Sequence, residues 1–212
     1  MMRLVVGNKN YSSWSMRPWV AMRAAGIEFE EVVLKFDSRE WEEQAPALLP
    51  SRRVPTLWID QHVVWDSLAI LETIAERAPS LWPGDPVARM RARALSAEMH
   101  SGFAELRKHM PMNIRARHPG KGRTPGALRD IERIVSAWSE CLAAGGPFLF
   151  GAFGNVDAMF APVALRFVTY DVELPELAAR YVAALREHPA VAAWVADALA
   201  ETEVVADEEI YA

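Results

Sequence analysis

The sequence is poor in cysteine and has no long apolar run. Cys141 is the single cysteine among 212 residues, which excludes an internal disulfide framework and a multi-cysteine zinc site. A single cysteine also fits a reducing, cytoplasmic setting. No uncharged apolar stretch reaches the roughly 18 residues of a membrane span, and the apolar run in MMRLVVGNKN is too short for a secretory signal. We therefore expect a cytoplasmic protein without a membrane partner.

Positive charge is also not in excess. The chain has 23 Lys and Arg against 28 Asp and Glu, a net charge of -5, which argues against a nucleic-acid partner. The charge is uneven, since residues 85–150 carry eleven basic and six acidic side chains, whereas residues 151–212 carry three and eleven. The basic residues are densest from Arg107 to Arg123. Such a run is commonly a solvated helix end or loop; the alternative is a positive field that attracts a small anion.

The first 78 residues alternate strand and helix signals. Short apolar runs predict strands at 4–7, 29–36, 54–59 and 63–65, the last two joined as a hairpin. Helices are predicted at 18–25, 40–48 and 67–78, with Pro18 in the first turn of the first and Gly26 as its C-terminal cap. The order βαβ followed by ββα predicts an α/β domain with a four-stranded mixed sheet.

The rest of the chain reads as helical. The proline-rich stretch APSLWPGDP predicts a linker over residues 79–86, between a first domain at 1–78 and an all-α second domain at 87–212. Helical patterns cover 87–108, 127–144, 156–170, 174–187 and 191–201. Cys141 falls in the second of these helices, and we expect it to be a small core residue.

Three serines mark the first candidate site, in the segment YSSWSMRP at residues 11–18. The segment lies between the first strand and the first helix, where ligands gather in open α/β sheets and where a helix N-terminus attracts anions. Any one of these serines is equally well explained as an ordinary helix cap. The functional alternative is a hydroxyl that donates a hydrogen bond to a bound thiolate.

Two further segments are candidates for ligand contacts. Val54-Pro55 stands at the entry to the third strand, where a cis bond would expose the Val54 backbone to an extended peptide. Cis bonds occur in only about one X–Pro bond in twenty, so the residues alone favour trans. Asp66-Ser67 precedes the third helix and either caps it or holds a ligand ammonium and carboxylate.

Together these segments resemble the glutathione S-transferases. SSWSMRPWVAMRAAGI is similar to the Ser-Ser-Cys-x-Trp-Arg segment of the zeta class, VPTL to the cis-proline motif, and WDSLAILETIAE to the (Glu/Gln)-Ser-x-Ala-Ile motif. In the helical half, FGNVDAMFAPV is similar to the capping-box motif of the family. The resemblance implies a thioredoxin-like first domain, glutathione as co-substrate, no metal, and a homodimer.

The resemblance also implies roles for individual residues. Ser12 would hold the glutathione thiolate, with Ser13 in reserve. The remaining implied contacts are Val54 and Pro55 for the cysteinyl backbone, Asp66 and Ser67 for the γ-glutamyl end, and Arg53, Arg52 or Lys35 for the glycyl carboxylate. An electrophile pocket is expected between the domains, lined by Trp14, Met110, Met112, Asn113 and Arg115. Apolar residues of this kind are also typical of a core.

Three positions depart from the family pattern. Trp14 stands where the zeta segment has Cys, Asp66 is one methylene shorter than Glu or Gln, and Gly154 replaces the Ser or Thr of the capping box. The expected function is a detoxifying transferase that joins glutathione to a small electrophile. The alternatives are a zeta-like glutathione-dependent cis-trans isomerase, which Trp14 disfavours, and a non-catalytic glutathione-binding or regulatory protein.

Overall fold

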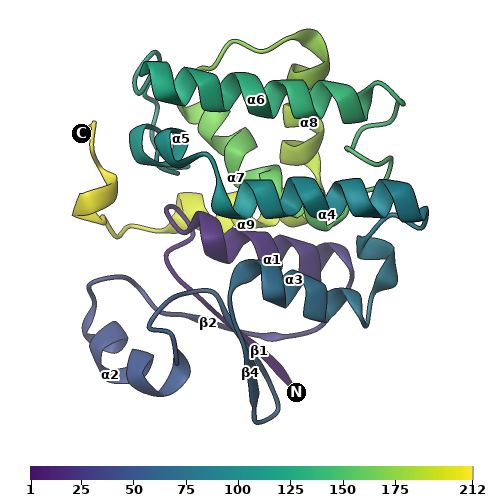
Figure 1. Cartoon of the computed structure of the whole chain (residues 1–212). Coiled ribbons are helices and arrows are strands. Elements are labelled where there is room, and N and C mark those ends of the chain that lie inside the picture. The colour runs from purple at the N-terminus through teal and green to yellow at the C-terminus, as the bar shows by residue number, and fades with distance from the viewer. Residues whose placement is uncertain (212) are drawn as a thin grey trace.

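A four-stranded mixed sheet forms one end of the molecule, in a computed structural model that describes residues 1–211 (Figure 1). Its strands are β1 (Met2–Val6), β2 (Glu30–Val33), β3 (Thr56–Ile59) and β4 (His62–Val64), in the order β2-β1-β3-β4. β1 and β2 are parallel, and the other two pairs are antiparallel. The predicted mixed sheet and its hairpin are therefore confirmed.

Three helices accompany the sheet: α1 (Ser13–Ala24), α2 (Arg39–Leu48) and α3 (Ser67–Ala75). α1 begins earlier than predicted, because the Ser12 side chain caps it and accepts a hydrogen bond from the Ser15 amide. Pro18 consequently lies inside the helix and not in its first turn, so that part of the prediction was wrong. The early start places Ser13 and Trp14 in the first helical turn.

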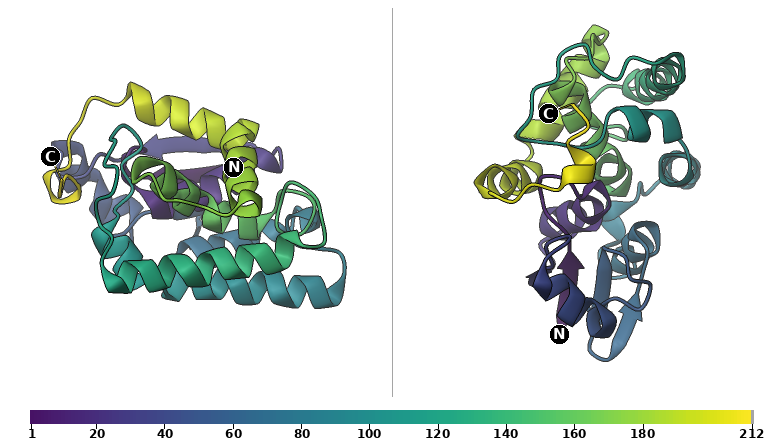
Figure 2. Two further views of the ribbon diagram at one scale, coloured as in Figure 1. Left: turned by 90° about the horizontal axis from the view of Figure 1, so that it is seen from above. Right: turned by 90° about the vertical axis from the view of Figure 1, so that its left-hand side faces the viewer.

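Within the described residues, the larger, helical part contains six α-helices: α4 (Pro86–Ser101), α5 (Ala104–His109), α6 (Pro125–Leu142), α7 (Asn155–Thr169), α8 (Glu176–Glu187) and α9 (Pro189–Ala200). Figures 1 and 2 show α4 and α6 running lengthwise along one face. The single helix predicted over 87–108 is wrong, because Gly102 is extended and Phe103 has a left-handed backbone (φ 59°) that separates α4 from α5. No helix within residues 1–211 is long and apolar enough to cross a membrane.

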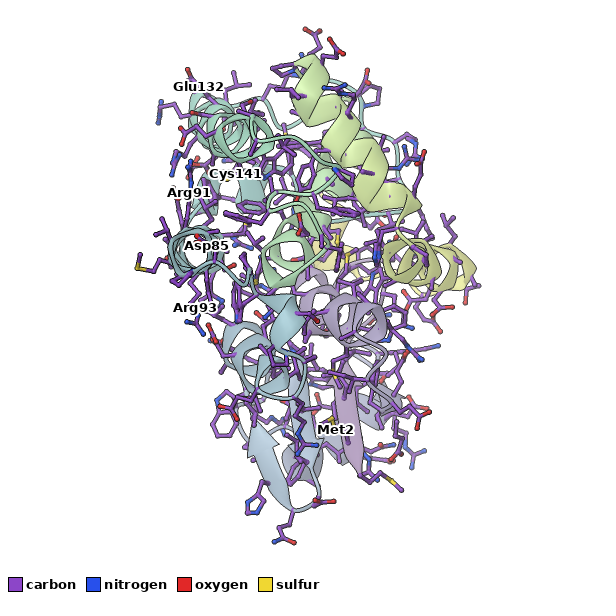
Figure 3. All side chains as sticks on the ribbon, turned by 90° about the vertical axis from the view of Figure 1, so that its right-hand side faces the viewer. Met2, Asp85, Arg91, Arg93, Glu132 and Cys141 are labelled. Atoms are coloured by element: carbon purple, nitrogen blue, oxygen red, sulfur yellow. The ribbon has the colours of Figure 1, made fainter. Side chains whose placement is uncertain are left out.

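α1 and α7 form the centre of the molecule. α1 packs against α7, α3 and α9, and one apolar core extends from Leu4 in the sheet to Trp194 in α9. Cys141 is a free, buried thiol within that core, as expected, and Figure 3 shows it among the helices, far from Met2 on the sheet. The sheet and the helices therefore share one interior.

The start of α7 is held by a buried carboxylate. Asp157 accepts hydrogen bonds from the amides of Gly154 (3.0 Å) and Leu149 (3.1 Å) and from the Tyr181 hydroxyl (2.9 Å). Burial raises the pKa of Asp157 to about 6. A Cβ on Gly154 would lie 2.7 Å from the Leu81 carbonyl oxygen. The close approach of Leu81 therefore favours glycine at position 154.

Candidate functional site

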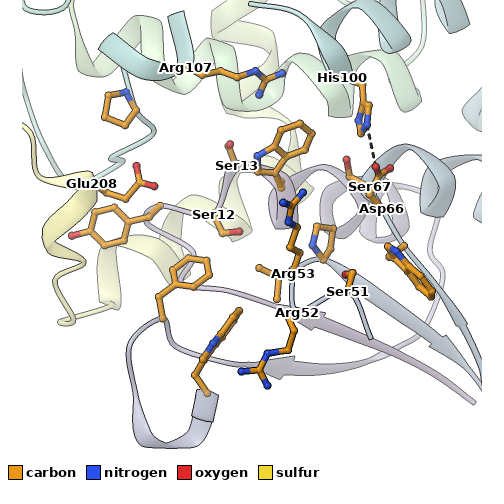
Figure 4. A pocket seen from close by; sticks show the side chains of 18 of the residues that line it. Ser12, Ser13, Ser51, Arg52, Arg53, Asp66, Ser67, His100, Arg107 and Glu208 are labelled. Carbon is orange, nitrogen blue, oxygen red and sulfur yellow. Dashed lines mark ion pairs between the residues drawn. The ribbon is translucent and has the colours of Figure 1, made fainter. Parts of the chain in front are cut away.

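A cleft of about 840 Å³ opens where β1 leads into α1, between the sheet and the helical part (Figure 4). This is where the alternating pattern of the first 78 residues predicted a ligand. The residues that line the cleft come from both halves of the chain and are Tyr11, Ser12, Ser13, Trp14, Phe36, Trp41, Ser51, Arg52, Arg53, Val54, Pro55, Trp65, Asp66, Ser67, His100, Arg107, Pro111, Arg166 and Glu208.

Ser12 and Ser13 both line the cleft but have different partners. The Ser12 hydroxyl donates to Ser15 Oγ over 2.7 Å, and Ser15 Oγ also accepts from the Gly7 amide over 3.1 Å. Ser13 Oγ instead accepts a hydrogen bond from Arg166 Nη2 over 3.2 Å. In Figure 4 the Ser13 hydroxyl points toward Arg107, whereas the Ser12 hydroxyl points toward the side of the cleft that carries Arg53. Of these two serines, only Ser12 caps α1.

The opposite wall consists of the two other predicted segments. The Val54–Pro55 bond is cis, as the resemblance to the cis-proline motif implied. The trans bond that the residues alone favoured was therefore the wrong expectation. The Trp65–Asp66 bond is also cis. Asp66 caps α3 by accepting from the Leu68 amide over 3.2 Å. Ser67 is buried, and its hydroxyl has no hydrogen-bond partner within residues 1–211, which leaves it available to a ligand.

Of the predicted basic residues, Arg52 and Arg53 line the cleft and Lys35 does not. Lys35 forms an ion pair with Glu203, which raises the pKa of Lys35. Both side chains of this pair are partly exposed. The structure thus places Lys35 against the C-terminal segment and leaves the two arginines beside the cleft.

The predicted electrophile pocket is only partly assembled. Trp14 lines the cleft, but Met110, Met112, Asn113 and Arg115 do not. The two methionines are buried in the core. These four residues lie outside the cleft because their loop packs inward against the C-terminal segment.

Polar bonds fix that loop in place. The Asn10 side-chain amide donates to Asn113 Oδ1 over 2.8 Å, and the Asn113 amide donates to Glu209 over 2.9 Å. Arg115 donates to the Glu203 carbonyl over 2.6 Å and to the Tyr11 hydroxyl over 3.0 Å. The loop therefore joins the start of the chain to its C-terminal segment.

Outside the predicted segments, five polar residues of the cleft were not predicted as site residues: Ser51, His100, Arg107, Arg166 and Glu208. His100 Nε2 lies 3.1 Å from Asp66 Oδ2, the ion pair drawn in Figure 4. Arg107 is the first residue of the dense basic run. The interpretation of that run as a positive field that attracts an anion would therefore have included it. Arg166 could also have been noticed in the sequence, because it is the one basic residue of helix α7.

Trp14 is surrounded by guanidinium groups. Arg17 lies 4.2 Å and Arg107 4.7 Å from the centre of the Trp14 ring. Burial and the repulsion of the neighbouring arginines hold the pKa of Arg17 well below its usual range. Burial lowers the pKa of both Arg107 and Arg166 to about 10, so both side chains stay charged at neutral pH.

The described part of the chain contains no group of three or more His, Cys, Asp or Glu side chains that would hold a metal ion. The polar groups that face the cleft are hydroxyls, guanidiniums, one imidazole and the carboxylates of Asp66 and Glu208. Such a set suits a zwitterionic or anionic organic ligand.

Comparison with known proteins agrees with this description. Two family models match: the glutathione S-transferase N-terminal domain over residues 11–77 and the C-terminal domain over residues 91–197. A probable maleylacetoacetate isomerase of Caenorhabditis elegans is 34% identical over 45% of each chain, so that match spans less than half of the relative. The maleylacetoacetate isomerase of Rattus norvegicus is 36% identical over 77% of each chain.

One solved structure shares the fold of this chain along almost its whole length. A glutathione transferase homologue from Burkholderia, solved with bound glutathione, superposes with a TM-score of 0.71 at 25% identity, covering 95% of this chain and 99% of that one. The thioredoxin-like sheet, the helical second half and the matched models lead to one conclusion. The chain belongs to the glutathione S-transferase family.

Proposed function

We propose that the cleft binds glutathione and that Ser12 holds its sulfur as a thiolate for attack on a small electrophile. One observation carries the proposal: the Ser12 hydroxyl stands at the N-terminus of α1 and faces a cleft whose other wall is Val54–Pro55 and Asp66–Ser67. The bound glutathione of the Burkholderia homologue supports the same ligand class.

The wall residues suit an extended tripeptide. Ser67 offers a buried, unpartnered hydroxyl to the γ-glutamyl carboxylate, and Asp66 offers a carboxylate to the ammonium. The Val54 backbone can pair with the cysteinyl unit. Arg53, assisted by Arg52, is the proposed partner of the glycyl carboxylate, because Lys35 is engaged with Glu203. This assignment places the cysteinyl sulfur near Ser12.

The Ser12 hydroxyl and the helix start together stabilise a thiolate. A free thiol with a pKa of about 8.5 is only a few per cent ionised at neutral pH. Lowering that pKa by about two units requires roughly 2.7 kcal/mol. A hydrogen bond to a charged acceptor contributes about 1.5–3 kcal/mol, and a helix N-terminus about 0.3–1 kcal/mol. Together the two contributions supply about 1.8–4 kcal/mol, a range that includes the required stabilisation.

Ser15 orients the donor. When Ser12 donates to the sulfur, its oxygen is free to accept the Ser15 hydroxyl proton, since the two oxygens are 2.7 Å apart and hydroxyl protons rotate. Ser15 Oγ keeps its bond from the Gly7 amide in both arrangements. The thiolate then attacks the electrophilic carbon, forming the carbon–sulfur bond while the leaving group departs with its electron pair.

The Ser12→Ala variant tests this role. We expect it to lose most of the ultraviolet thiolate absorbance of bound glutathione at neutral pH, while glutathione still binds through the opposite wall. Ser101→Ala, which removes an exposed hydroxyl of α4, is the matched control. An unchanged thiol titration in Ser12→Ala would refute the assignment.

A second candidate is glutathione-dependent cis-trans isomerisation, which the names of the curated relatives favour. In that reaction the thiolate adds to a double bond, rotation follows, and elimination returns glutathione. Assays with maleylacetone and with 1-chloro-2,4-dinitrobenzene separate the two, because only conjugation consumes glutathione. Binding without either turnover would identify a non-catalytic binding or regulatory protein.

Family membership is also the ground for proposing a cytoplasmic homodimer. Analytical ultracentrifugation of the full chain measures the oligomeric state, and a sedimenting species of monomer mass at micromolar concentration would refute the dimer.

A further inference from the structure

The loop that leads from β1 into α1 is held by a carboxylate from the segment that follows α9. Glu201, the C-terminal cap residue of α9, accepts hydrogen bonds from the amides of Lys9 over 2.6 Å and of Asn10 over 2.9 Å, one with each carboxylate oxygen. Figure 1 shows this segment, in yellow, leaving α9 beside the start of α1. Two successive amides that converge on one anion form a backbone nest, and bonds to an ionised acceptor are about twice as strong as neutral ones.

Two other bonds from the same region hold the same loop. The Lys9 carbonyl accepts from Trp194 Nε1 of α9 over 3.0 Å, so both backbone polar groups of Lys9 are engaged. The Tyr11 hydroxyl donates to Glu209 over 2.6 Å. Of these contacts, only that of Glu201 joins a charged group directly to the backbone of the loop. Glu201 is therefore the contact that fixes the path of the main chain most directly.

The path of this loop sets the position of Ser12. The Asn8 carbonyl accepts from the Ser12 amide over 2.8 Å and closes a turn. Lys9 and Asn10 form the middle of that turn, and Glu201 binds both of their amides. A displacement of the turn would move the Ser12 hydroxyl relative to a bound sulfur. Hydrogen bonds weaken steeply away from good geometry, so a small displacement has a measurable effect.

We propose that Glu201 is a positioning residue for Ser12: its carboxylate fixes the turn from which the Ser12 hydroxyl donates to the glutathione thiolate. The proposal rests on the function proposed above. It gives part of the control of the thiol pKa to a side chain that is not among the residues lining the cleft. Arg115 holds Glu201 in turn, by donating to the carbonyls of Glu201 and Glu203.

The charge of Glu201 and its positioning role act on the thiol in opposite directions. A negative charge nearby disfavours a thiolate, so removing that charge alone would lower the thiol pKa of bound glutathione. Weakening the hydrogen bond from Ser12 to the thiolate raises the same pKa. The sign of the shift therefore separates a positioning role from a simple electrostatic one.

Glu201→Gln tests the proposal in the full chain with glutathione. The new side chain keeps one acceptor but turns an NH₂ donor toward the loop amides. We expect the thiol pKa of bound glutathione, followed by thiolate absorbance, to rise by about 0.5–1 unit, roughly half the value of a hydrogen bond to a charged acceptor. Glu203→Gln is the matched control. It removes the same charge from a carboxylate that pairs with Lys35, and should leave the thiol pKa unchanged or slightly lower.

A double-mutant cycle shows whether Glu201 acts through Ser12. In the Ser12→Ala background, Glu201→Gln should not raise the thiol pKa further, because the hydroxyl that it positions is gone. Glu201→Asp keeps the charge and shortens the side chain by one methylene, so its thiol pKa should lie between those of the wild type and Glu201→Gln. It also keeps the test valid if Glu201→Gln fails to fold.

An unchanged or lowered thiol pKa in both Glu201 variants would overturn the positioning role, as would an equal rise with and without the Ser12 hydroxyl. The proposed function is checked separately. An unchanged titration in Ser12→Ala, or absence of glutathione binding in isothermal titration of the wild type, would refute that function and the positioning role with it. A shift in Ser12→Ala with none in the Glu201 variants would refute the positioning role alone.

Discussion

Ser12 and Ser13 are neighbours in sequence with separate environments. Ser12 caps α1 and shares a hydrogen bond with Ser15, whereas Ser13 Oγ accepts from Arg166. The difference arises because the helix begins at Ser13, which rotates each successive side chain by about 100°. Adjacent hydroxyls are therefore directed at different parts of the cleft.

At this scale we predict that Ser15→Ala raises the thiol pKa of bound glutathione by about 0.4–1 unit, the equivalent of one neutral hydrogen bond. The Ser12 hydroxyl would remain but lose the bond that orients it. The thiolate fraction at neutral pH should then fall, and the rise of kcat/KM with pH should move to higher pH. Titration of the thiolate absorbance measures the shift.

Ser13→Ala is the companion variant, since its oxygen serves Arg166. We expect the thiol pKa of bound glutathione to match that of the wild type within about 0.3 unit, because the Ser12 hydroxyl still donates its hydrogen bond to the thiolate. If Ser13→Ala abolishes the thiolate and Ser12→Ala keeps it, the roles of the two serines are reversed.

At the scale of one element, α7 gives a prediction that opposes simple capping rules. Serine is a better N-cap than glycine by a few tenths of a kcal/mol, so Gly154→Ser should stabilise an isolated helix. Here the added Cβ would lie 2.7 Å from the Leu81 backbone oxygen. We expect a loss of about 1–3 kcal/mol, typical of overpacking. Urea unfolding measures it, and a gain in stability would show that Leu81 moves aside.

The Asp157 carboxylate at the same helix start accepts three buried hydrogen bonds. Asp157→Asn places an amide nitrogen against at least one of those donors, and we expect a loss of about 2–4 kcal/mol in the free energy of unfolding. Tyr181→Phe is the matched control, because it removes one donor and leaves the carboxylate with its two backbone bonds. A larger loss in Tyr181→Phe than in Asp157→Asn would contradict this account.

Elements differ in how far the sequence predicts them. Apolar periodicity located the strands and the helices α6, α7, α8 and α9 closely, because their burial follows local patterns. It missed the break at Gly102-Phe103, since a left-handed phenylalanine is set by tertiary packing. It also missed the early start of α1, which depends on which of several serines forms the cap.

At the scale of the whole molecule, the shared core predicts cooperative unfolding. One apolar cluster joins residues of β1, α1, α3, α4, α6, α7, α8 and α9. Trp194 Nε1 in α9 also donates to the Lys9 carbonyl over 3.0 Å. We expect far-ultraviolet circular dichroism and tryptophan fluorescence to report one coincident urea transition. Two resolved transitions would show that the sheet and the helices unfold separately.

The lining of the cleft also divides into residues that the local sequence predicts and residues that only tertiary packing brings there. Ser12, Val54, Asp66 and Ser67 were predicted because each stands beside a strand or helix end in a segment that resembles a motif of the family. Lining residues from the helical part, such as Arg107, were not predicted as site residues, because only the tertiary packing of the helices, with α7 against α1 and α4 against α7, brings them there. The same packing keeps Met110, Met112, Asn113 and Arg115 out of the cleft, whereas Pro111 of the same loop lines it.

The aromatic lining of the cleft gives the protein its own optical reporter. Three of the eight tryptophans, Trp14, Trp41 and Trp65, line it, and Trp14 lies against two guanidinium groups. A nitroaromatic ligand seated there would quench their emission, whereas glutathione alone would change it little because it does not absorb in that range. Each substrate can therefore be followed separately, in the unlabelled protein, as it arrives.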